Sequence, residues 1–364
     1  MYLYLHFKTI TVHTKYILPL FLLVQIVLLQ FFPFFPEIFE QYYSNGIYPF
    51  ISRFFRLTLG GLPFSVGDCI YLVLIFMMLR WFWNTRKSWR QKWSNNLLTI
   101  LSTLSIFYFL FHILWGLNYY RKPLFEKMKI EREYSQEDLL GFTDKLIAKT
   151  NAIQLEITKN KTLKVVNPYK QEKIFAMSTN GYTVLASEYP FLNYSNPSIK
   201  KSLFSLPLTY MGFGGYLNPF TNEAQVNYKV PKYGFPLVIC HEMAHQMGFA
   251  SESECNFIGF LATIKNKDLY FQYSGYVLAL KYCLGNIQDK DPIKAKIYFD
   301  KLNSGIIINF KEDRLFWEHY ESFIETGFHI FYDHFLKINQ QKEGIESYSK
   351  FVDLLVNYYK EKEF

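Results

Sequence analysis

The stretch FPLVICHEMAHQMGFASESECNF, residues 235–257, holds the spacing on which the interpretation of this chain depends. Its HEMAH segment places His241 and His245 four residues apart, so on a helix both side chains lie on one face and can bind one metal ion. Glu242 lies between them, where it can take a proton from a water molecule that the metal activates. The stretch therefore predicts a Zn2+ site with Glu242 as the catalytic general base.

The flanking residues predict where this helix begins and ends. Pro236 is a residue that the first helical turn tolerates, and Gly248 is the residue type that most often ends a helix. We therefore expect a helix over about 236–248.

A catalytic zinc ion takes three protein ligands and a water molecule, so a third ligand should follow the two histidines. Glu252 and Glu254 are the nearest carboxylates. Ser251 and Glu254 have the spacing of a capping box, which would give Glu254 a structural task. Glu252 lies one turn before Asn256, whose amide could orient it. We therefore prefer Glu252 as the third ligand and keep Glu254 as the alternative. 

Glu223 is a further, weaker alternative ligand. For this residue we prefer a solvent-facing carboxylate in a turn.

Composition indicates a membrane part joined to a second domain. Of the 364 residues, 50% are hydrophobic and 20% are aromatic, yet 19% are charged. Three apolar runs cover about residues 17–35, 66–83 and 97–117, and ~20 apolar residues are needed to cross a bilayer. Buried helices of a soluble protein would normally show a polar face. We therefore expect three transmembrane helices.

Charge predicts how these spans are oriented. The segment from Arg80 to Asn96 has no acidic residue and carries five basic ones: Arg80, Arg86, Lys87, Arg90 and Lys92. By the positive-inside rule it is cytoplasmic, so everything after Tyr120 lies on the other side. No cleavage site follows the first run, which indicates a retained anchor. We expect residues 1–120 to form the membrane anchor and residues 121–364 an extracytoplasmic domain.

The net charge of +8 is explained by the lipid bilayer as a partner, so no nucleic acid is expected. Arg121, directly after the third span, is interpreted as an anchor at the membrane interface. The four cysteines show no disulfide pattern, and we expect small buried side chains at Cys69, Cys240, Cys255 and Cys283.

The second domain is predicted to be α+β and mainly helical. Ser135 should cap a helix over 135–150, and Asp291-Pro292 should open a helix within the helical region 286–364. The segment AQVNYKV, residues 224–230, alternates as a strand does.

HExxH followed by ExxAN resembles the gluzincin arrangement, and the helix also looks like metallopeptidases that cleave phage and stress-response repressors. The residues are His241-Glu242-Met243-Ala244-His245 and Glu252-Ser253-Glu254-Cys255-Asn256. More closely, the chain resembles a bacterial family of three-pass membrane proteins of unknown function. The matching stretches are WGLNYYR (115–121), GYLNPFTNEAQVN (215–227), the HEMAH core and GIESYSKFVDLL (344–355).

The resemblance implies a zincin-like domain behind the three spans, placed at the bacterial cytoplasmic membrane. It also implies that the strand at Ala224–Lys229 lies above the site, where its backbone could pair with an extended peptide. A Cys stands at 255 where the motif has Ala, a change between small residues.

Two functions of different kind follow as hypotheses. The first is a membrane-anchored zinc metallopeptidase acting on a peptide or protein substrate. The presence of Glu242 as a general base favours this hypothesis. The alternative is a non-catalytic binding or sensor protein that keeps the same fold. A donor to the oxyanion would be needed by the first, and the candidates are His319, His329, His334 and Tyr348. Three spans with few internal charges argue against a transporter.

Overall fold

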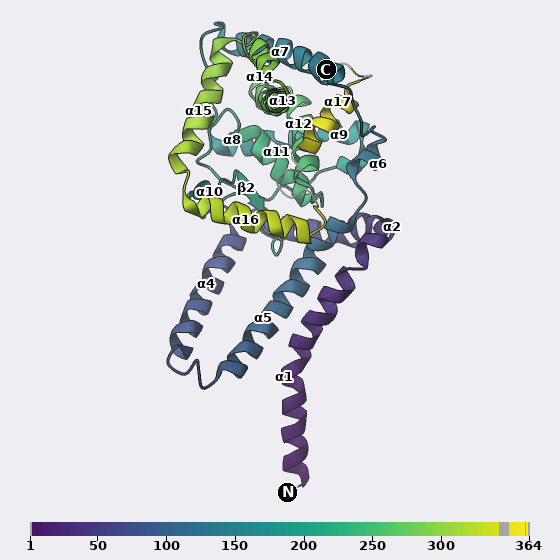
Figure 1. Ribbon diagram of the computed structural model, residues 1–364, viewed down its shortest axis with the longest axis vertical. Coiled ribbons are helices and arrows are strands. Elements are labelled where there is room, and N and C mark those ends of the chain that lie inside the picture. The colour runs from purple at the N-terminus through teal and green to yellow at the C-terminus, as the bar shows by residue number, and fades with distance from the viewer. Residues whose placement is uncertain (1, 342–348, 361, 363–364) are drawn as a thin grey trace.

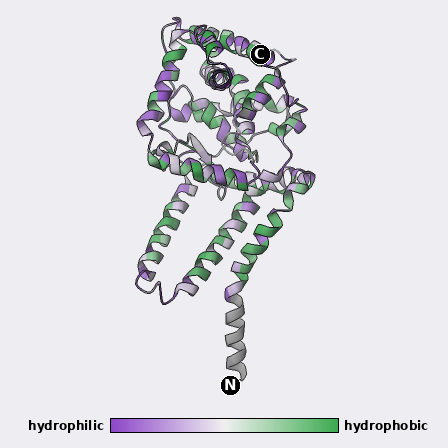
Figure 2. Cartoon of the chain, in the orientation of Figure 1, coloured by the Kyte–Doolittle hydropathy of each residue, from purple (hydrophilic) through white to green (hydrophobic). Residues whose placement is uncertain are grey.

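Three long helices leave one side of a mainly helical body (Figure 1). The computed structural model describes residues 2–341, 349–360 and 362. The three helices are α1 (Tyr2–Leu29), α4 (Val66–Thr85) and α5 (Trp93–Leu114). Each contributes to a segment long and apolar enough to cross a membrane, and only 11% of each segment is buried. These segments are Lys15–Phe34, Val66–Thr85 and Trp93–Leu114, so three long apolar helices lie where the spans are predicted, with small shifts at their ends (Figure 2).

We call the remaining elements the body, and helices dominate it as predicted. Before the third span these are η1 (Phe32–Phe34), α2 (Pro36–Ile38), the π-helix η2 (Phe39–Ile47) and α3 (Tyr48–Leu59). After it come η3 (Gly116–Tyr120), α6 (Leu124–Met128), α7 (Gln136–Thr158), α8 (Gln171–Met177), α9 (Thr179–Glu188), η4 (Pro190–Leu192) and α10 (Ser205–Tyr210). The chain continues with α11 (Phe235–Gln246), α12 (Glu252–Ile264), α13 (Leu269–Lys290), α14 (Pro292–Phe299), α15 (Ser304–Tyr320), α16 (Phe323–Ile338) and α17 (Ser349–Tyr358).

The expected helix caps are present. Ser135 caps α7 through a capping box with Asp138, and the Asp291 side chain accepts a hydrogen bond from the Lys294 amide at the start of α14. Helix α7 runs on to Thr158, beyond the expected end at 150, because apolar residues continue to face the core at Ile153 and Ile157.

A small sheet of three strands lies beside α11. Its order is β1 (Ile199–Lys201), β3 (Ala224–Val226), β2 (Gly215–Leu217), with β1 parallel and β2 antiparallel to β3. The predicted strand 224–230 therefore stops early. The reason is Asn227, whose side-chain oxygen accepts from the Lys229 amide and whose amide donates to Phe213 O, so the chain turns there.

Because β3 is the central strand, the expectation that its backbone could pair with a peptide is wrong. Strand addition needs an unpaired edge. In this sheet β2 and β1 are the edges.

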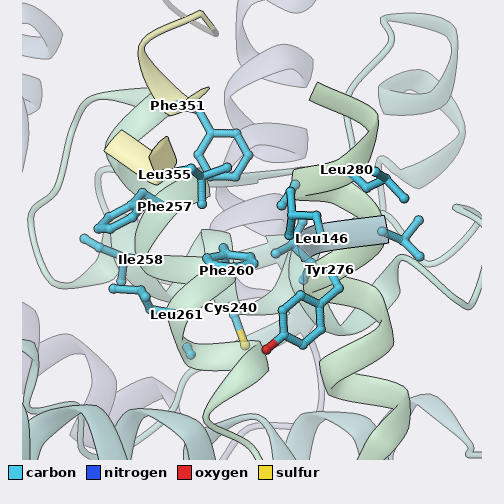
Figure 3. Packing of buried hydrophobic residues seen from close by; sticks show 14 of the residues in the cluster. Leu146, Cys240, Phe257, Ile258, Phe260, Leu261, Tyr276, Leu280, Phe351 and Leu355 are labelled. Carbon is cyan, nitrogen blue, oxygen red and sulfur yellow. The ribbon is translucent and has the colours of Figure 1, made fainter. Parts of the chain in front are cut away.

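The core of the body forms where α11, α12 and α13 pack together (Figure 3). Cys240 of α11, Phe257 and Phe260 of α12 and Leu280 of α13 are fully buried there. Gly259 allows the first two helices to approach closely, because an added Cβ would lie 3.0 Å from the His241 backbone nitrogen. Cys240, Cys255 and Cys283 are buried free thiols as expected, and Cys69 is a free thiol with partial exposure.

The segments next to the spans hold the C-terminal end of α11. Tyr48 and Ser52 of α3 donate hydrogen bonds to Gln246 O at 3.0 and 2.8 Å. Trp115, directly after α5, donates its indole N–H to His245 O at 3.2 Å. The last carbonyls of a helix lack partners within the helix, so the contacts from Tyr48 and Ser52 satisfy Gln246 O, while His245 O also accepts from the Gly248 amide.

Glu223 fastens the start of α4 to the sheet. Its fully buried carboxylate accepts hydrogen bonds from Val66 N at 3.1 Å and Gly67 N at 2.6 Å. The expectation of a solvent-facing carboxylate is therefore wrong. The first amides of α4 need acceptors, and the favourable interaction of a carboxylate with a helix N-terminus places Glu223 there.

We predict that Glu223→Ala destabilises the protein, because it leaves two buried amides without an acceptor. The expected loss is about 1–3 kcal/mol of unfolding free energy. Thermal unfolding in detergent measures it. The control is Glu172→Ala, which removes an exposed carboxylate paired with Lys201 and should change stability little. Equal melting temperatures for Glu223→Ala and the wild type would contradict the capping role.

Candidate metal centre

Helix α11 presents His241 and His245 on one face, one turn apart. The helix runs from Phe235 to Gln246 with Pro236 in its first turn, close to the predicted 236–248. It ends at Gly248, whose φ of +85° is a conformation that favours glycine. An added Cβ there would lie 2.8 Å from atoms of Tyr48 and Asn118, so space and backbone both require glycine.

The chain reverses after Gly248, and α12 begins with Glu252 beside the two histidines. Glu252 Oε2 lies 3.2 Å from His241 Nε2, and Glu252 Oε1 lies 3.7 Å from His245 Nε2. The two Nε2 atoms are 3.1 Å apart. The structure therefore brings together the three residues preferred as ligands, with their ligand atoms within 4.8 Å of one another.

Hydrogen bonds to the other ring nitrogens fix how the imidazoles point. His245 Nδ1 lies 2.8 Å from Phe249 O, a carbonyl that can only accept, so Nδ1 carries the proton. His241 Nδ1 lies 2.9 Å from Asn256 Oδ1. With both Nδ1 atoms donating, both neutral rings present an Nε2 lone pair to the same point.

This arrangement fits a cation. Two lone pairs 3.1 Å apart, facing a carboxylate, repel one another unless a positive charge lies between them. Two imidazoles and one carboxylate are also the donor set of one common class of catalytic zinc site. The residues present therefore suit Zn2+.

Asn256 has a different partner from the one expected. Its Oδ1 accepts from His241, so the expectation that it orients Glu252 is wrong. The i, i+4 spacing was compatible with contact inside α12, but Asn256 lies on the face of α12 that packs against α11. It remains a positioning residue for the site, acting through a histidine.

Glu254 lies away from the three grouped residues. Its buried carboxylate accepts from the Leu124 amide at 2.6 Å, and it is no member of the His241, His245 and Glu252 cluster. Ser251 is the N-cap by position, but its hydroxyl contacts Ser253 instead of an amide of the helix. The predicted capping box is therefore wrong, because the Leu124 amide in the adjoining segment competes for Glu254.

Glu242 faces a cavity with one oxygen free of hydrogen bonds. The residue is buried, and among the described residues its Oε2 has no hydrogen-bond partner. Strand β2 approaches it closely, since a Cβ added at Gly215 would lie 2.6 Å from Glu242 Oε1. Burial raises the pKa of Glu242 to about 7, although the nearby His241 and His245 act against this.

Glu252 behaves in the opposite way. Burial disfavours its charged form, but the neighbouring His241 and His245 outweigh burial and hold the pKa of Glu252 well below its usual range. The pKa values of the two carboxyl groups are thus shifted in opposite directions. Glu252 is an anion that suits a metal ligand, and Glu242 can exchange a proton near neutral pH.

The cavity beside these residues has a volume of about 590 Å³. Its walls come from α11, α12, β2, α10, α16 and the body-side ends of α4 and α5. Val238 and Phe328 are among the apolar side chains that line it, while His241, Glu242 and Glu252 lie at its polar end. Such a space, mostly apolar with a few converging polar groups, is typical of a ligand site.

Tyr332 of α16 is a site residue that the sequence interpretation missed. Its hydroxyl donates to Glu252 Oε1 at 2.6 Å, and the side chain lines the cavity. Of the donors proposed from sequence, His329 also lines the cavity, whereas His319 and His334 are not among its lining residues. Tyr348 lies outside the described residues. The 328, 332 and 335 spacing of aromatic residues on one helix face was the signal that could have pointed to Tyr332.

Arg121 clamps the turn between the two ligand-bearing helices. It pairs with Glu40 (Nε to Oε2, 3.1 Å) and donates to Gly248 O at 2.8 Å, with its guanidinium over the Phe249 ring. Its side chain is almost fully buried. The prediction of a simple interface anchor is therefore wrong, since Arg121 takes part in positioning Phe249, whose carbonyl holds His245.

These observations define a mainly helical protein with three candidate membrane spans and a His–His–Glu cluster in its body. Residues 43–356 match a family model described as a protein of unknown function, DUF3810. The match covers most of the chain, and the chain belongs to that family. No curated protein and no solved structure matches it.

We predict that purified protein binds one zinc ion per chain, and that Glu252→Ala and His245→Ala remove it. Each change takes away one of three converging ligands, whereas Glu254→Ala should keep the metal because Glu254 accepts from Leu124. Metal analysis of the detergent-purified variants measures this. Loss of zinc in Glu254→Ala alongside retention in Glu252→Ala would contradict the ligand assignment.

Proposed function

We propose that this protein is a membrane-anchored zinc metallopeptidase that hydrolyses peptide bonds outside the cytoplasm. The observation that carries the proposal is the convergence of His241, His245 and Glu252 on one point, next to the unpartnered Oε2 of Glu242 in a cavity. The resemblance of HExxH and ExxCN to the gluzincin arrangement supports the same reaction class. A protein that only stored a metal would not require a base at 242.

His241, His245 and Glu252 would hold the zinc ion, with Asn256 and the Phe249 carbonyl fixing the two rings. When bound, zinc supplies a Lewis acid that makes water acidic near neutral pH and polarises a carbonyl. Glu242 then accepts the proton of the attacking water at Oε2 and returns it to the leaving amine. Burial, which raises the pKa of Glu242, favours a group that can return the proton as well as accept it.

Tyr332 is our candidate for the donor that stabilises the oxyanion. Its hydroxyl donates to Glu252 and therefore lies beside the His–His–Glu cluster. The hydroxyl can turn from the Glu252 carboxylate to a substrate oxygen. His329 lines the cavity on the same helix and is the second candidate.

Strand β2 is positioned to align a peptide. It is an edge of the sheet, its residues Gly215, Tyr216 and Leu217 line the cavity, and Gly215 lies next to Glu242. An extended peptide paired with this edge would run past the catalytic residues, which is a known mode of peptide recognition.

The body is proposed to lie outside the cytoplasm because of the basic segment at residues 86–92. This connection between α4 and α5 lies at the end of the spans away from the body (Figure 1). The positive-inside rule assigns such a connection to the cytoplasm. Because it has three apolar helices, the protein is proposed to be a multi-pass protein of the bacterial cytoplasmic membrane.

We predict that Glu242→Gln abolishes peptide hydrolysis and keeps zinc. The change removes the base but none of the three ligands, so at least a roughly 100-fold loss of kcat is expected. Tyr332→Phe should keep zinc and lower kcat by about 10²–10³-fold. Cleavage of a peptide library by the protein in vesicles, followed by mass spectrometry, measures both. Unchanged cleavage in Glu242→Gln would refute the peptidase; zinc binding with no cleavage of any library member would favour the binding or sensor protein.

We predict that the body is reached from outside intact spheroplasts. Ile293 of α14 is 80% exposed, so Ile293→Cys should react with a membrane-impermeant maleimide added outside. A cysteine at Lys87 in the basic connection should react only after lysis and serves as the matched control. The reversed pattern would contradict the orientation.

A further inference from the structure

Helix α16 carries an apolar face that the described residues of the body leave exposed. Phe323, Phe331 and Ile338 are 86%, 60% and 69% exposed, and Ile324 and Ile330 extend the same face. These positions fall within one stripe of a 3.6-residue helix. His334, which is exposed on this face, and the Asp333–Lys337 pair beside it (2.7 Å) are polar groups of the kind that reach lipid headgroups.

The neighbouring face of α16 is a wall of the cavity. Phe328, Tyr332 and Phe335 all line it, and Phe335 packs against Phe111 at the body-side end of α5. The helix therefore separates the cavity from whatever covers Phe323, Phe331 and Ile338.

Helix α3 has the same character. Its buried face, with Tyr48, Ser52 and Arg56, bonds to the body. Its other face exposes Phe50, Phe54 and Leu57 by 76%, 61% and 56%. The segment that contains α3 joins the end of α1 to the start of α4, so both of its ends lie at one surface of the membrane.

The cavity reaches the level of the spans. Figure 1 shows α16 running across the base of the body, on the side from which α4 and α5 leave. Tyr71 lines the cavity and lies five residues into α4, about 8 Å along the helix at 1.5 Å per residue. Phe111, in the last turn of α5, lines it as well.

We propose that α3 and α16 lie in the plane of the membrane surface and that the cavity is entered from the bilayer between α16 and the ends of α4 and α5. Amphipathic helices with large apolar side chains on one face lie in the interface in this way. Lipid is the occupant because the exposed apolar faces continue those of the spans, which are themselves covered by lipid. A second protein copy on these faces is an outcome that the test must detect.

The entrance limits what can reach His241, Glu242 and Glu252. A substrate that enters from the bilayer surface is itself held there, so the substrate class is a membrane-anchored or lipid-attached polypeptide. This last step rests on the proposed peptidase function, whereas the entrance does not.

The first experiment measures depth in the membrane. In a Cys69→Ser background, Phe50→Cys and Phe331→Cys are labelled with an environment-sensitive nitrobenzoxadiazole dye in the full chain, reconstituted in phosphatidylcholine–phosphatidylglycerol vesicles. Both exposed positions tolerate a label, and Ile293→Cys on α14 is the matched exposed control. Nitroxide lipids should quench the dye at 50 and 331 and leave it bright at 293. Quenching at 50 and 331 by aqueous iodide to the extent seen at 293, or by neither quencher, would overturn the in-plane placement.

The second experiment asks from where the cavity is entered. Val238→Cys places a thiol in the cavity wall in a Cys69→Ser background, since the other three native cysteines are buried. A maleimide on a C16 chain should label it at least roughly tenfold faster than a sulfonated maleimide, because the acyl chain partitions into the bilayer. Ile293→Cys should show the reverse preference. Faster labelling of Val238→Cys by the sulfonated reagent would overturn the entrance, and because neither reagent needs zinc or catalysis, that result leaves the peptidase proposal standing.

Discussion

The hydrogen bonds to the last carbonyls of α11 are the interaction on which the rest of the structure depends. The last carbonyls of a helix lack the amides of a following turn, and here those of His245 and Gln246 accept from Trp115, Tyr48 and Ser52. In the turn that follows, Gly248 O accepts from Arg121. The same end carries His245 and leads into the reversal that delivers Glu252. The donors all come from segments that adjoin the three apolar helices, so those segments help to set the geometry of the His–His–Glu cluster.

Because of these hydrogen bonds, the N-terminal segments help to shape the candidate site and do not serve as an anchor alone. Sequence interpretation separates an anchor, residues 1–120, from a domain that follows it, yet hydrogen bonds from Tyr48, Ser52 and Trp115 cross that line to the end of α11. Glu223 adds a further connection, since it caps α4 from the sheet that flanks Glu242.

Local patterns predicted the local structure well. The HExxH helix, its end at Gly248, the caps at Ser135 and Asp291 and the three apolar spans all follow from residues within a few positions of one another. The grouping of Glu252 with the histidines could also be predicted from the sequence, because a short reversal constrains where the next helix begins.

Long-range partners could not be predicted from spacing alone. Glu254 and Asn256 were assigned to neighbours in their own helix, but the Leu124 amide and His241 hold them. Arg121 and Glu223 were interpreted as surface groups, although burial with partners far away in sequence decides both. Tyr332 was missed because a face of a helix near the C-terminus has no sequence link to the motif it meets.

X-ray absorption spectroscopy of the zinc-loaded protein in detergent tests the central claim most directly. The account predicts a first shell of two imidazole nitrogens at about 2.0–2.1 Å with oxygen and no sulfur, although Cys255 Sγ lies 3.3 Å from His245 Nδ1. In the Glu252→Ala variant, the spectrum should no longer show this set of nitrogen and oxygen neighbours around zinc. A shell with sulfur, or protein that takes up no zinc when it is supplied, would contradict a His–His–Glu metal centre.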